Sequence, residues 1–153
     1  MASPARGIAL LLLVVSVALV VAATTMPWSS YYVGHSHWAQ VEWVPFSRLV
    51  RPDDMVLNVL LFVPLGFSLY LCGAAGGGQK SPAGDEAADG AASARRVRGR
   101  VLGVVIGAIL LSTAVEFFQV YCHGRLPTTT DIISNALGAF FGARSAVAGE
   151  AGR

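Results

Sequence analysis

Residues 101–121 read VLGVVIGAILLSTAVEFFQVY, an apolar run in which Glu116 is the single acidic or basic side chain. A helix needs about 20 mostly apolar residues to cross the hydrocarbon core of a bilayer, so this run predicts a transmembrane helix. Of the 153 residues 54% are hydrophobic and only 13% are charged, whereas soluble domains are about 25% charged. The composition excludes an ordinary soluble domain, and a net charge of +2 argues against a nucleic-acid-binding protein.

Three further runs extend this prediction to four transmembrane helices in one small all-α domain, residues 1–153. Residues 7–24 and 55–72 carry no charge, and the fourth run is residues 131–149. The fourth run crosses only if the long side chain of Arg144 reaches the nearer surface. Residues 7–24 could also be a cleaved signal peptide, but their apolar run is longer than a usual signal core and no good cleavage site follows. We therefore expect a retained span.

The basic residues predict the orientation of the bundle, because cytoplasmic loops carry an excess of Lys and Arg. Most of them lie before the first run, between the second and third runs, and after the fourth. We therefore expect a multi-pass protein of the cell membrane with both termini in the cytoplasm. Residues 73–93 should form a flexible cytoplasmic linker, and the aromatic-rich residues 27–51 should lie along the outer membrane surface. Cys122 should be accessible from outside.

Polar side chains of three runs then reach a similar depth near the outer surface. Glu116 and Gln119 share one face at the outer end of the third run. Asn58 lies near the outer start of the second run. Asp131 opens the fourth run, and Asn135 follows one turn later on the same face. Intramembrane ionisable residues usually face a bundle interior or a cavity, so the sequence predicts one shared polar pocket.

Small and helix-bending residues predict the shape of the bundle around this pocket. Pro64 removes a backbone donor and should bend the second helix, and together with Gly66 it should widen the outer half. Glycine pairs with the spacing that permits close helix contact are Gly103 with Gly107 and Gly138 with Gly142.

Structural roles for the polar residues stay open as alternatives. Asp131 could simply complement the dipole of the fourth helix, and Asn58 and Asn135 could hydrogen-bond between helices. Glu116 could form a buried ion pair with Arg125. Pro64 and Gly66 could serve packing alone.

Metal binding is a further possibility that the sequence favours little. His35 and His37 could hold a metal with a third ligand, but their spacing matches no strong zinc pattern. We expect neither a metal nor a cofactor.

The polar residues belong to an ordered set of motifs. They are Val44-Pro45-Phe46, Asn58-x-x-x-Phe62-x-Pro64-x-Gly66, Glu116-x-x-Gln119, Arg125, and Asp131-x-x-x-Asn135-x-x-Gly138. In this set, over roughly residues 43–142, the chain resembles the VanZ-like family of small bacterial membrane proteins. It departs from the family at Thr128, where members often have an acid. The resemblance implies a role in the cell envelope, since the family name is linked to low-level resistance to teicoplanin, a lipoglycopeptide.

Three functions fit these observations. The first is non-enzymatic binding of an envelope lipid or lipid-linked molecule, such as a cell-wall precursor or a lipoglycopeptide. Amide groups, Arg125 and the start of the fourth helix would donate to an anionic head group. The second is an intramembrane enzyme with Glu116 as general acid or base. The third is a structural partner in an envelope complex. The expected ligand-binding residues are Asn58, Glu116, Gln119, Arg125, Asp131 and Asn135, supported by Pro64, Gly66 and Gly138.

Overall fold

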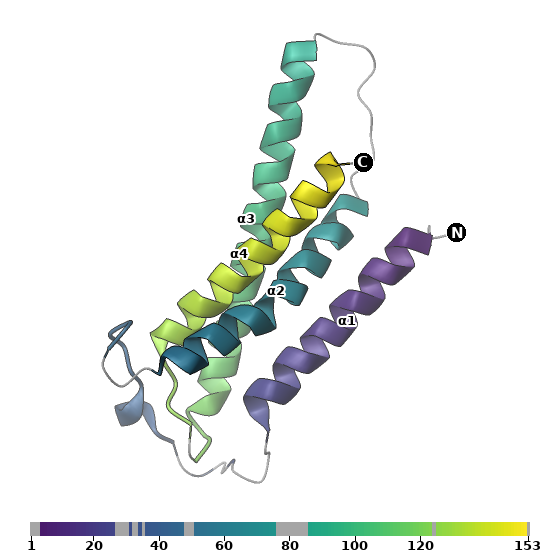
Figure 1. Cartoon of the computed structure of the whole chain (residues 1–153). Coiled ribbons are helices and arrows are strands. Elements are labelled where there is room, and N and C mark those ends of the chain that lie inside the picture. The colour runs from purple at the N-terminus through teal and green to yellow at the C-terminus, as the bar shows by residue number, and fades with distance from the viewer. Residues whose placement is uncertain are drawn as a thin grey trace.

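The computed structural model describes residues 4–26, 31, 34, 36–47, 51–75, 86–123 and 125–152. The helices are α1 (Pro4–Thr25), the short 3-10 helix η2 (Trp38–Gln40), α2 (Pro52–Ala75), α3 (Glu86–Gln119) and α4 (Thr129–Ala151). The long helices run in alternating directions, so that both ends of the chain lie at one end of the bundle (Figure 1). Among the described residues, β-pairing is limited to two isolated bridges. The predicted all-α class is therefore confirmed.

Three of the helices are long and apolar enough to cross a membrane, over Arg6–Thr25, Pro52–Ala74 and Gly90–Gln119. They turn large apolar side chains outward: Leu11 is 64% exposed, Leu57 62% and Leu110 66%. So large an exposed apolar surface suits hydrocarbon and not water. α4 is 23 residues long but is rich in Ala, Gly, Ser and Thr, and it is not among these three apolar spans.

The backbones of α2 and α4 touch directly where both helices carry glycine. A Cβ built on Gly66 would overlap the backbone of Ala139, and one on Gly138 or Gly142 would overlap the backbone of α2. The predicted close contact through Gly138 and Gly142 is thus confirmed. α2 continues as a helix through Pro64, and the bend expected there stays a prediction.

The other glycine pair does not make the contact that its spacing predicts. A Cβ added to Gly103 or Gly107 would meet no described atom of another element within 4 Å. Val104 and Ala108 are instead the buried residues at this level of α3. The prediction of close packing through this pair was wrong, because α3 turns the glycines away from the bundle.

The predicted flexible linker, residues 73–93, was too long. α2 continues to Ala75 and α3 begins at Glu86, so the described residues at both ends of this segment are helical, and residues 76–85 lie outside the described part. Alanine is the strongest helix former, and it is frequent between Glu86 and Ala94. The alanines therefore extend α3 beyond the predicted span.

Two connections lie together at the end of the bundle opposite the termini (Figure 1). The backbone N–H of His37 donates to Val120 at 2.8 Å, and that of Glu42 donates to Pro127 at 2.9 Å. The connection between α1 and α2 is thereby held against the connection between α3 and α4. Cys122 lies in this contact and is only 4% exposed, so the expected accessibility of its thiol was wrong. The described aromatic side chains that the connection between α1 and α2 leaves exposed are Trp38, Trp43 and Phe46.

Candidate functional site

A cavity of about 530 Å³ lies among the four long helices at the end opposite the termini. Its walls come from the last turn of α1, the first turns of α2 and α4, the last turns of α3, and the connection before α4. The structure brings all the residues predicted to bind a ligand to this one cavity: Asn58, Glu116, Gln119, Arg125, Asp131 and Asn135. Their role in binding stays a prediction.

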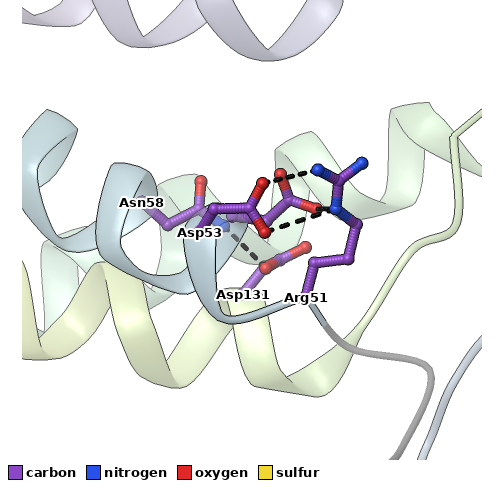
Figure 2. Close-up of polar contacts among 5 residues, drawn as sticks. Arg51, Asp53, Asn58 and Asp131 are labelled. Carbon is purple, nitrogen blue, oxygen red and sulfur yellow. Dashed lines mark hydrogen bonds and ion pairs between the residues drawn. The ribbon is translucent and has the colours of Figure 1, made fainter.

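One wall joins α2 to α4. Figure 2 shows the side chains of Asn58 and Asp131 pointing toward one another, and Nδ2 of Asn58 donates to Oδ1 of Asp131 at 2.6 Å. Near them Arg51 pairs with Asp53 through its Nε at 3.3 Å. Both of these side chains are more than half exposed, so Arg51 belongs to the rim of the cavity.

The opposite wall joins α3 to the start of α4. Glu116 is 7% exposed, and its Oε2 accepts the backbone N–H of Thr128 at 2.9 Å. Thr128 also caps α4, since its Oγ1 accepts the backbone N–H of Asp131 at 3.0 Å. A Ser or Thr cap stabilises a helix by satisfying one of its free amides. Thr128 therefore joins Glu116 to the start of α4: its backbone N–H binds the Glu116 carboxyl group, and its hydroxyl group binds the backbone amide of Asp131.

Arg125 makes different contacts from those considered in the sequence. Its guanidinium donates to the carbonyl oxygens of Ala23 at 3.3 Å and Met26 at 3.4 Å. Within the described part of the chain, the ion pairs are formed by Arg51 with its neighbouring aspartates. The alternative of a buried ion pair between Glu116 and Arg125 is therefore not borne out.

The remaining amide side chains are also engaged. Nε2 of Gln119 donates to the carbonyl of Thr24 at 2.9 Å, and Nδ2 of Asn135 donates to Oγ of Ser112 at 2.8 Å. With Asn58, all three amides thus donate to protein acceptors. Each amide nitrogen has a second N–H, so the expectation that these groups donate to an anionic ligand stays a prediction. At Asn135 the side-chain oxygen Oδ1 is buried and has no partner among the described residues.

Several lining residues were missed in the sequence, among them Thr24, Arg51, Asp54 and Thr128. Arg51 and Asp54 come just before the second apolar run, so the predicted topology already placed them at the outer end. Thr128 was seen only as a departure from a family pattern. Its capping role could have been inferred from its position three residues before Asp131.

The histidine-based metal site finds no support. His35 lies outside the described residues, and no three described His, Cys, Asp or Glu side chains come together as metal ligands. The cavity itself brings two buried or half-buried carboxyl groups together, those of Glu116 and Asp131.

The motif pattern and the helical arrangement have a counterpart among known families. A family model described as VanZ/LLP1 matches residues 9–148. The chain belongs to the VanZ/LLP1 family. This confirms the resemblance drawn from the motifs, and the matched region of this VanZ/LLP1 protein includes every residue of the cavity. No curated protein and no solved structure matches the chain.

Proposed function

We propose that this VanZ/LLP1 protein binds an envelope lipid or lipid-linked molecule in the cavity, from the outer leaflet of the cell membrane. All four long helices cross the bilayer in this proposal, and both termini are cytoplasmic. The arginines of residues 95–100 lie near the start of α3, at the end of the bundle that holds the termini (Figure 1). The excess of basic residues at that end supports a cytoplasmic location for it.

The observation that carries the proposal is the mixed lining of the cavity. Polar side chains form its interior, whereas Leu57, Leu61 and Leu126 contribute apolar surface. Leu57 and Leu126 are also largely exposed on the outside of the bundle. A head group could enter among the polar side chains while an acyl chain stays against the leucines and the surrounding bilayer. Binding sites commonly combine apolar walls with a few placed polar groups.

The test is to identify lipid bound to the purified protein. The protein is extracted with its native lipids, and bound lipid is measured by mass spectrometry for the wild type and for Asn58→Leu, Glu116→Gln and Asp131→Asn. Ile106→Ala, on the exposed outer face of α3, is the control. We expect specific lipid on the wild type and control and depletion in the cavity variants. Equal lipid on all of them would contradict the proposal.

A contribution to glycopeptide resistance follows from the same binding, because a protein that holds an envelope lipid changes what a lipoglycopeptide can reach. Expression of the wild type should raise the teicoplanin concentration that a susceptible host tolerates. The cavity variants should lose this effect at equal membrane levels. An unchanged phenotype in all variants removes the link to resistance.

A further inference from the structure

We propose that the cavity recognises a protonated amine, and that its lipid is one with a phosphoethanolamine head group. This inference rests on the proposed function and names the chemistry of the ligand. It adds an ammonium group to the anionic head group expected from the sequence, because the structure shows which polar atoms of the cavity residues have partners in the protein.

Each amide side chain of the cavity interior already uses one N–H donor on the protein. Asn58, Gln119 and Asn135 each donate through the amide nitrogen to an oxygen of the protein. The first amides of α4 are also taken, since Asp131 donates to the cap and Thr129 donates to Glu42 at 3.1 Å. A helix N-terminus binds anions through free N–H groups. Among these groups, an anionic ligand would therefore find only the second N–H of each amide.

The interior also contains hydrogen-bond acceptors with unused capacity. Asn135 is 2% exposed and lines the cavity, yet its Oδ1 has no partner among the described residues. A buried polar atom is usually hydrogen-bonded, so an unpaired one calls for an explanation. Glu116 and Asp131 add further capacity, because a carboxyl group has two oxygens with about four lone-pair sites. The interior is thus suited to a ligand that donates.

An ammonium group fits this set better than a hydroxyl group. It carries three N–H donors and no acceptor, and three separate side chains, Glu116, Asp131 and Asn135, offer acceptors around one cavity. Its positive charge also favours the two carboxyl groups, and a charge-assisted hydrogen bond is stronger than a neutral one. A quaternary ammonium has the charge but no N–H donor, so it should bind less well.

The rim supplies the opposite charge. Arg125 is exposed, and only one of its terminal nitrogens makes the contacts to Ala23 and Met26. Arg51 is exposed at the same cavity. A guanidinium has five N–H donors in a geometry that suits a phosphate group. A ligand with an inner ammonium and an outer phosphate therefore matches both parts of the site.

The experiment compares three lipids on the purified protein by native mass spectrometry. They are phosphatidylethanolamine, phosphatidylcholine with its methylated amine, and phosphatidylglycerol with no amine. We expect retention of phosphatidylethanolamine to exceed that of the other two by about tenfold, because a site built for a hydrogen-bond donor rejects analogues that lack it. Equal or stronger retention of phosphatidylglycerol overturns the amine proposal but leaves lipid binding intact. Retention of no lipid overturns both.

Free phosphoethanolamine distinguishes the two sources of the same head group. Displacement of the bound lipid by the soluble compound identifies the head group as sufficient for recognition. Retention of the lipid in its presence, with the same selectivity among lipids, identifies the intact amine-headed lipid as the ligand.

Variants at Asn135 test the unpaired oxygen. Asn135→Leu removes it and should abolish the preference for phosphatidylethanolamine, whereas Asn135→Asp keeps an acceptor and should retain the preference. Asp131→Asn is the second variant, in case Asn135→Leu does not fold, and it should weaken the preference by removing a negative charge. Ile106→Ala is the matched control. A preference that is unchanged in folded Asn135→Leu and Asp131→Asn protein overturns the proposal.

Discussion

The side-chain amide of Asn58 donates a 2.6 Å hydrogen bond to Asp131, and this contact joins α2 to α4 beside the cavity. Asp131, Asn135, Gly138 and Gly142 follow one face of α4 at helical spacing. The first two carry polar side chains that hydrogen-bond to α2 and α3, and the two glycines bring the backbones of α2 and α4 into contact. The cavity therefore lies where this face changes from polar side chains to glycine.

A double-mutant cycle should measure this contact. Hydrogen bonds between helices in membranes contribute about 0.6 kcal/mol on average and at most about 1.7 kcal/mol. We expect Asn58→Leu and Asp131→Leu to show a coupling of about 1 kcal/mol in the free energy of unfolding in detergent. Asn58→Leu with Tyr70→Phe is the control, because Tyr70 donates to Glu150 and lies far along α2 from Asn58. Additivity in both cycles would show that the Asn58 contact contributes nothing.

The two glycine pairs should respond to alanine in opposite ways. Gly138→Ala and Gly142→Ala place a methyl group in the backbone of α2, and overpacking costs roughly 1–3 kcal/mol. Gly103→Ala and Gly107→Ala add a methyl group in open space and should gain up to about 1 kcal/mol from helix propensity. Thermal unfolding of all four variants in one detergent checks this. Loss of stability at Gly103 or Gly107 would reveal a partner that packs on the outer face of α3.

The contrast between these pairs shows how far the sequence could predict the fold. Hydropathy indicates where each helix meets the membrane surface, and position within the helix then gives the depth of each side chain. That reasoning placed Asn58, Glu116 and Asp131 at one level. Glycine spacing indicates only that close contact is possible, because it does not give the rotation of the helix about its axis.

The partners of the polar groups were less predictable for the same reason. Gln119 donates to a backbone carbonyl at the end of α1, and Glu116 accepts from the backbone of Thr128. The first contact depends on how α1 is placed against α3, and the second on the path of the connection before α4. No side-chain pattern encodes either of them. The sequence therefore predicted the members of the site but not which of their atoms remain available to a ligand.

A substitution at Phe46 should show how the backbone near the cavity contributes to the stability of the protein. The φ of Phe46 is 58°, in the left-handed region, which costs a residue with a Cβ about 1–2 kcal/mol. Its side chain is 57% exposed, so Phe46→Gly should lose little packing and raise the free energy of unfolding in detergent by about 1 kcal/mol.

Thr130 stabilises the backbone at Phe46 through a hydrogen bond. Its Oγ1 accepts the backbone N–H of Phe46 at 2.8 Å, and the residue is fully buried. Thr130→Val keeps the shape but removes the acceptor, and should lower the free energy of unfolding by about 1 kcal/mol. The two variants are compared by thermal unfolding. A shift in the same direction for both would mean that the backbone conformation at Phe46 is not what determines stability there.

The orientation of the bundle can be measured with introduced cysteines. Cys122 is a poor reporter because it is buried, so both native cysteines are first replaced by alanine. Ser36→Cys then tests the end that carries the cavity, and Ser93→Cys tests the start of α3; both residues are exposed. An impermeant maleimide should label Ser36→Cys on intact cells, and should label Ser93→Cys only after the membrane is opened. The reverse pattern would place the cavity on the cytoplasmic side, where no ligand of the outer leaflet could reach it.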